Sequence, residues 1–311
     1  MFLEQGVKPQ NKFWKYLLGA AIIILGFSIG QILLDLLVIL VASSDHSSKI
    51  PGTANRALGY LPPNVTLCLL MITYLITLGV MYLVFRYLHQ QTWKSFVTSR
   101  VKMNWPRILF ALSLGAAYWI LWYGSLVYLY PAEQKFAFKP LPFALYFSIL
   151  FILTFIRSLT EQLVYVGYLL QGFANLSKNR WFPLIMVSVI SSAIYATHPE
   201  ISARGFITMF SYQFILSFFL CVITLMDEGI ELAVGFCAAK MLINQCFFTS
   251  ETTALKTSAL FVSIDTGENS SFVLQDFTGR FIIIAIFILI CSKKYHWRDW
   301  RFKLSGKILT A

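Results

Sequence analysis

Eight runs of apolar residues constrain this chain more than any other feature. A helix needs about 20 apolar residues to span the hydrocarbon core of a bilayer. The runs predict an all-α fold, a bundle of about eight transmembrane helices that forms one domain over residues 1–311. The eighth run is short for a span, and a separate helical piece at 161–174 follows the fourth closely enough to continue it. The expected spans are 17–42, 65–85, 108–130, 141–159, 182–197, 207–226, 230–248 and 281–291.

The charged residues lie mainly between these runs, which is typical of a polytopic membrane protein. Only 13% of the 311 residues are charged, whereas a soluble domain has about 25%. The net charge of +11 comes from lysines and arginines that gather in alternate connections. Cytoplasmic loops carry such an excess, so the bias places both termini in the cytoplasm.

The basic balance does not indicate a nucleic acid as partner. The chain has no zinc-finger spacing and no aromatic–basic strip of the RNA-binding kind, so the lipid bilayer is the partner that the charge predicts. The five cysteines lie in or beside apolar runs, and their odd number does not fit a disulfide framework. We expect most of them to be small buried side chains.

Polar and ionisable side chains interrupt the apolar sequence within residues 161–241. Such groups cost free energy at bilayer depth, and they usually face the interior of a bundle or a wet cavity. Their concentration in one segment predicts a single polar site inside the bundle. The residues concerned are Glu161, Gln162, Tyr195, His198, Glu231, Cys237 and Lys240.

Glu161 is the first candidate for chemistry, because a buried carboxylate can act as a general base that activates water. On position alone, the simpler interpretation is a helix-start residue that the helix dipole stabilises. The run E-Q-L-V-Y-V-G-Y-L-L-Q-G, however, resembles the first motif of the CAAX prenyl endopeptidase and bacteriocin-processing (CPBP) family of intramembrane metalloproteases. That motif is Glu-Glu-x-x-x-Arg, commonly followed by Gly-Tyr-Leu-Leu. Glu161 keeps the first glutamate, whereas Gln162 replaces the second and Val166 replaces the arginine.

The second motif of the family, Phe-x-x-x-His, can be aligned in two ways. In the first alignment His198 is the catalytic histidine, and Ile194 stands in place of the phenylalanine. In the second, Pro199 and Glu200 match the Asn-Pro-Glu that often follows the motif, so Tyr195 takes the histidine position. We favour the second alignment, because it needs no gap. In either case, a histidine before a proline at a helix end is often only a cap.

The third motif is His-x-x-x-Asn, and the run M-D-E-G-I-E-L-A-V-G-F-C-A-A-K-M resembles its surroundings. Cys237 takes the histidine position, Lys240 the first asparagine position and Met241 the second. Cys237 and Met241 are four residues apart and share a helix face. They can bind a soft metal, but the simpler interpretation is that they are packing residues.

The resemblance covers most of the chain and implies a multi-pass protein of a bacterial inner membrane. In the family, glutamate and histidine activate a water for peptide hydrolysis. Here Glu161 is the catalytic residue that is clearly retained, and His198 is a second candidate. A zinc site needs about three protein ligands, so we expect no metal or other cofactor unless the protease is active. The resulting interpretation is a degenerate protease that binds a membrane protein or peptide without cutting it.

Two other functions remain open. One is an active endopeptidase with an altered site built from Glu161, from Tyr195 or His198, and from Cys237. The other is a small transporter that uses Asp35, Glu161 and Lys240 as a relay.

Lys240 also raises a question of charge, because it lies about ten residues into its span. We expect it to replace the lost motif arginine and to pair with Glu161. The alternative is that it extends along its helix to a lipid headgroup.

The charge bias also predicts that the long connection 249–279 faces the periplasm. A cysteine introduced at Ser270 should therefore react with an impermeant thiol reagent in intact spheroplasts, and the parent protein with its native cysteines is the control. Reaction of the introduced thiol only after lysis would reverse the assignment.

Overall fold

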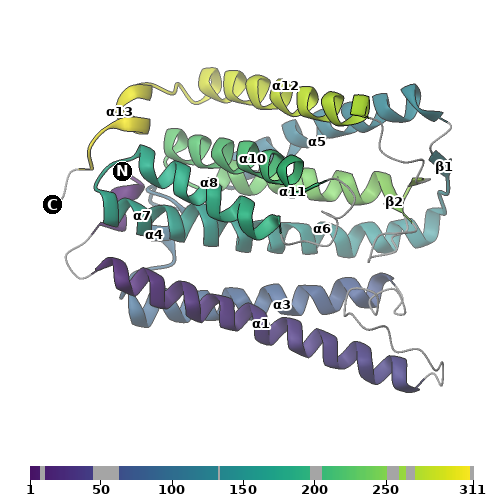
Figure 1. Cartoon of the computed structure of the whole chain (residues 1–311), viewed down its shortest axis with the longest axis horizontal. Coiled ribbons are helices and arrows are strands. Elements are labelled where there is room, and N and C mark those ends of the chain that lie inside the picture. Colours follow the sequence, from purple (N-terminus) through teal and green to yellow (C-terminus); the bar gives the residue numbers. More distant parts are fainter. Residues whose placement is uncertain are drawn as a thin grey trace.

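The computed structural model describes residues 1–7, 11–44, 63–131, 134–196, 205–250, 259–263 and 270–308. This part of the chain is mostly helical, and its long helices run roughly along one direction (Figure 1). A helix lies at each of the eight segments that the apolar runs predict. These helices are α1 (Phe13–Ser44), α3 (Pro63–Leu83), α5 (Trp105–Leu129), α6 (Pro140–Gln162), α8 (Trp181–Tyr195), α10 (Phe206–Asp227), α11 (Glu231–Phe247) and α12 (Ser270–Lys294).

The protein is a multi-pass helical membrane protein. Within the described residues, five helical stretches are long and apolar enough to cross a bilayer. Helices α8 and α11, with 15 and 17 residues, are shorter than the roughly 20 residues of a full span. Helix α12 extends the eighth apolar run at both ends. The five candidate spans are Phe13–Leu40, Asn64–Leu88, Trp105–Leu129, Pro140–Ser177 and Phe206–Asp227.

The fourth span is much longer than its apolar run. Helix α6 continues through the π-helical turn η5 (Leu163–Leu169) into α7 (Leu170–Ser177), so one rod of 38 residues covers Pro140–Ser177. At 1.5 Å per residue it is about 57 Å long. The piece at 161–174 therefore continues the fourth helix, and Glu161 lies well inside the rod.

The shorter elements cap the two ends of the bundle. Near both termini lie η1 (Leu3–Gln5), η3 (Val84–Leu88), α4 (Lys94–Val97) and α13 (Trp300–Ser305). At the opposite end (Figure 1), three strands form a small sheet in the order β1–β3–β2. The sequence analysis did not predict this sheet, because its strands have only three residues each. They are β1 (Gln134–Phe136), β2 (Phe248–Ser250) and β3 (Phe261–Ser263), with β1 antiparallel and β2 parallel to β3.

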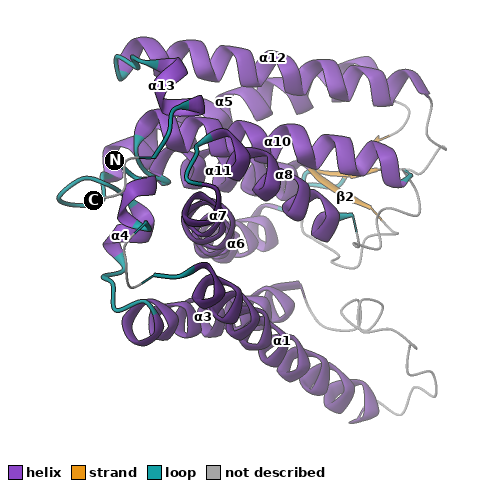
Figure 2. Cartoon of the chain, turned by 60° about the vertical axis from the view of Figure 1, so that its left-hand side comes forward, coloured by secondary structure: helices purple, strands orange, loops and turns teal. Residues whose placement is uncertain are grey.

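The helices are arranged around α11. Figure 2 shows the hairpin of α1 and α3 on one side of the molecule and α12 with α5 on the other. Helix α11 packs most extensively on α5, and most of its side chains are buried. Ser158 of α6 also donates a 2.7 Å hydrogen bond to the Val234 carbonyl. Helix α11 is therefore an interior helix, and its packing determines where its side chains lie in the bundle.

Small residues allow α11 and α5 to approach closely. A Cβ atom on Gly235 would lie 2.8 Å from the Cβ of Ala111 and would also meet the Ile108 carbonyl oxygen. A Cβ on Gly115 would lie 3.0 Å from that of Ala239. Membrane helices commonly use such small residues where their backbones pack together.

Buried acids fix the turn between α10 and α11. The side chains of Asp227 and Glu231 are fully buried. Arg100 lies 3.1 Å from the Asp227 carboxylate and 3.2 Å from that of Glu231, and Arg107 also pairs with Asp227. These ion pairs hold the turn against the connection between α4 and α5 and against the first turn of α5, close to both termini.

The α5–α11 contact yields a stability prediction. Gly235→Ala should lower the free energy of unfolding by about 1–3 kcal/mol, because a tightly packed site resists an added methyl group. Gly79→Ala is the matched control, since nothing lies within 4 Å of its added Cβ, and it should be neutral or raise stability by up to about 1 kcal/mol. Thermal unfolding in detergent measures both variants. Equal stability of the two would contradict the packing argument.

Candidate functional site

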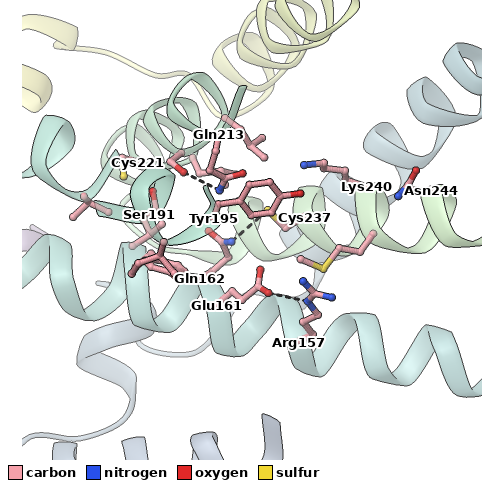
Figure 3. Close-up of a pocket in the computed structure, with 18 of the residues that line it drawn as sticks. Arg157, Glu161, Gln162, Ser191, Tyr195, Gln213, Cys221, Cys237, Lys240 and Asn244 are labelled. Atoms are coloured by element: carbon pink, nitrogen blue, oxygen red, sulfur yellow. Dashed lines mark hydrogen bonds and ion pairs between the residues drawn. The ribbon is translucent and has the colours of Figure 1, made fainter. Parts of the chain in front are cut away.

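A cavity of about 240 Å³ lies between the middle of the long α6–η5–α7 rod and helices α8, α10 and α11 (Figure 3). The residues that the sequence analysis assigned to a degenerate site come from three segments far apart in the chain. The structure brings all of those it describes to the wall of this one cavity. They are Glu161, Gln162, Val166, Tyr195, Cys237, Lys240 and Met241.

The wall residues of α8 lie well along that helix. Helix α8 begins at the exposed Trp181, a residue type that is enriched at the membrane surface. Ser191 and Tyr195 follow it by 10 and 14 residues, which corresponds to about 15 and 21 Å along the helix axis.

Glu161 lies inside a continuous rod, because its helix does not end near residue 159, where the apolar run stops. The rod instead continues for 16 residues after Glu161, to Ser177. Glu161 and Tyr195 therefore meet at one cavity without a re-entrant segment.

Glu161 forms an ion pair with Arg157, one turn earlier on α6. Arg157 Nε lies 2.8 Å from Glu161 Oε1, and both residues line the cavity. The expectation that Lys240 fills this place is wrong, since the ion-pair partner of Glu161 is Arg157. Lys240 nevertheless lies on the cavity wall. The position of the lost motif arginine holds Val166, whose side chain is buried and apolar.

Arg157 is the main site residue that the sequence analysis missed. It lies near the end of the apolar run 141–159, and the sequence analysis gave it no role. A local signal was available, since oppositely charged residues four apart on a helix lie on the same face.

Gln162 and Cys237 are in direct contact. Gln162 Nε2 lies 3.3 Å from Cys237 Sγ, within the geometry of a hydrogen bond, and both side chains are buried. These two positions correspond to the second glutamate and the third-motif histidine in the resemblance described above. The replaced residues thus still face each other across 75 residues of sequence.

Much of the remaining polar wall is already occupied by hydrogen bonds within the protein. Ser191 donates to the Ser188 carbonyl at 3.1 Å, and Gln213 Nε2 donates to Ser217 Oγ at 3.2 Å. Asn244 Oδ1 accepts a 3.0 Å hydrogen bond from the Tyr123 hydroxyl. Gln213 and Asn244 had not been predicted, because single amides in an apolar helix carry no motif.

Two predicted residues lie away from the cavity, and a third lies outside the described residues. Glu231 is fully buried at the end of the bundle and pairs with Arg100. Asp35 lies on α1 and is not part of the cavity wall, so the relay of a small transporter is not assembled there. His198 lies outside the described residues.

The cavity wall does not fit a metal site of the usual kind. Among the described residues, no three or more His, Cys, Asp or Glu side chains are grouped to hold a metal ion. One oxygen of Glu161 is occupied by Arg157, and Cys237 accepts from Gln162. A catalytic zinc ion needs about three protein ligands and an open position.

Comparison with known proteins gives little help with function. The chain is 22% identical over 254 residues to "Uncharacterized protein YyaK" of Bacillus subtilis (strain 168). The aligned region covers 79% of this chain and 81% of that protein. No family model matches the chain, and no solved structure matches it significantly.

The Arg157–Glu161 ion pair yields a testable coupling. Arg157→Met alone should destabilise the protein by about 1–3 kcal/mol, because it leaves the Glu161 carboxylate unpaired in an apolar setting. Adding Glu161→Gln should recover part of this loss. Unfolding of the single and double variants in detergent measures the coupling energy.

The matched control replaces Arg157 by the other cation of the wall. Lys240→Met combined with Glu161→Gln should show a smaller coupling energy than Arg157→Met combined with Glu161→Gln. Coupling of Glu161 to Lys240 but not to Arg157 would contradict the assigned pair.

Proposed function

We propose that this chain is a CPBP-like intramembrane protein that binds a segment of a membrane protein or peptide in its cavity without cleaving it. The observation that carries the proposal is the convergence of three motif-like segments on one cavity. Val166, Tyr195 and Met241 are far apart in the sequence, yet each lines the same wall. A cavity with a few polar groups inside a helical bundle is a common place for a ligand.

The state of the retained carboxylate supports binding rather than hydrolysis. A general base must be within hydrogen-bond reach of the proton that it removes. Glu161 is instead held by Arg157, and the two histidine positions of the resemblance hold Tyr195 and Cys237 in the favoured alignment. Glu161 and Cys237 thus both have partners within the protein.

One observation favours an active endopeptidase as the second candidate. Glu161, Tyr195 and Cys237 line a common cavity, which is what an altered catalytic site requires. This candidate would use Glu161 to activate water, and it would have to release the carboxylate from Arg157 first.

We also propose that the protein lies in a bacterial inner membrane with both termini in the cytoplasm. Both chain ends lie at the same end of the bundle, with α4 and α13 (Figure 1). These two helices carry Lys94, Arg301 and Lys303. An excess of basic residues marks the cytoplasmic side.

A peptide library separates binding from cleavage. The purified protein, incubated with membrane-spanning peptides in lipid nanodiscs, should retain a subset of them and leave them intact. The same preparation should contain no stoichiometric zinc by elemental analysis. Specific cleavage that Glu161→Ala abolishes would establish the active protease. The control is Leu121→Ala, a change on the outer face of α5 where the side chain is 73% exposed.

A further inference from the structure

The amide of Gln162 is the most unusual group in the cavity. Its side chain is only 4% exposed, and Figure 3 shows the amide directed away from its own helix into the cavity. Nε2 donates to Cys237 Sγ at 3.3 Å. Oε1 is buried and has no hydrogen-bond partner among the described residues.

The orientation of this amide follows from its neighbour. Nε2 is directed toward Cys237 Sγ, so the carbonyl oxygen is the end of the amide that is left without a hydrogen-bond partner among the described residues.

A second acceptor on the cavity wall is also buried without a hydrogen-bond partner among the described residues. This acceptor is Oε1 of Gln245. Gln245 lies eight residues after Cys237 on α11, about 12 Å further along the helix axis. Two acceptors on the cavity wall, Gln162 Oε1 and Gln245 Oε1, therefore lack a hydrogen-bond donor among the described residues.

Few components of a bilayer bring a hydrogen-bond donor to a cavity between transmembrane helices. Lipid acyl chains carry no hydrogen-bond donor. In an intact transmembrane helix, the backbone N–H groups already donate to carbonyls of the same helix. Where a helix is locally unwound, its N–H groups are free and must be paired by protein or water. The cavity, at about 240 Å³, is smaller than the pockets of 300–1,000 Å³ that hold drug-sized ligands, so it takes a short stretch of chain and not a whole helix.

We infer that the ligand is a transmembrane segment with a break in its helix, and that Gln162 Oε1 accepts a backbone N–H from that break. The inference rests on the proposed binding function and names the feature of the partner that the cavity selects. The resemblance has a glutamate at this position. The neutral amide keeps an acceptor without placing a second carboxylate beside Glu161.

The test uses three synthetic peptides and the full-length protein in nanodiscs. The first is a leucine-rich peptide of about 20 residues with a central Gly-Gly-Pro break. The second is an unbroken leucine-rich peptide of the same length, and the third is the broken peptide with its amides N-methylated at the break. The broken peptide should bind about tenfold more tightly than either of the others, the scale of one lost hydrogen bond.

Two variants test the role of Gln162. Gln162→Met should lower the affinity for the broken peptide about tenfold, because it keeps the volume and removes the acceptor. Leu121→Ala is the control, since that side chain lies on the outer face of α5 and is 73% exposed. It should change the affinity less than threefold. The N-methylated peptide tests the same bond on the unchanged protein, so the result does not depend on the variant folding.

The outcomes distinguish this inference from the proposed peptide-binding function on which it rests. Equal binding of all three peptides, or full affinity in Gln162→Met, would overturn the role of the break and leave the binding function standing. Absence of binding by any membrane peptide would overturn both.

Discussion

The structure depends on the cost of leaving a charged or polar group unpaired inside a lipid bilayer. In the cavity, Arg157 pairs with Glu161 and Gln162 pairs with Cys237. In each contact, a polar or charged side chain has a partner that lowers the free-energy cost of placing it among apolar helices. Because the partners come from the same rod and from α11, the polar groups also hold these two elements in a fixed relation.

Two backbone features bring the polar groups together. The rod Pro140–Ser177 continues for 16 residues after Glu161, and its π-helical turn η5 begins directly after Gln162. Such turns are frequent at functional sites, because they shift the side-chain register of a helix. On the other wall, the close approach at Gly235 seats α11 against α5 and so places Cys237 opposite Gln162.

Much of the fold could be predicted from the apolar runs. Each run forms a helix, because an apolar segment in a bilayer must satisfy its own backbone. The sequence left open whether the piece at 161–174 continues the fourth helix, since Glu161 and Gln162 break the apolar pattern at the junction, and the structure shows that it does. The small sheet gave no signal, because its strands are too short to show an alternating pattern.

The site was predicted in part. The resemblance selected residues from three segments, and the seven that the structure describes share one cavity. Arg157 was missed because a cation near the end of an apolar run is typical of a loop. The pairing of Lys240 with Glu161 was wrong because sequence distance gives no information about which cation is nearer in space. The role of Glu231 at the turn depends on Arg100, which is 131 residues away in the sequence.

The central claim is that the rod and α11 face each other at Gln162 and Cys237, inside the helical bundle. It is tested most directly by cross-linking Gln162→Cys to native Cys237, with the other four cysteines replaced by serine, using a short thiol-specific bifunctional reagent and mass spectrometry. The control is Ile152→Cys, which lies on the same rod with its side chain 52% exposed. The structure predicts a cross-link from position 162 to Cys237 and none from position 152. Absence of the 162–237 cross-link, when a monofunctional reagent labels both thiols, would contradict the arrangement on which the site rests.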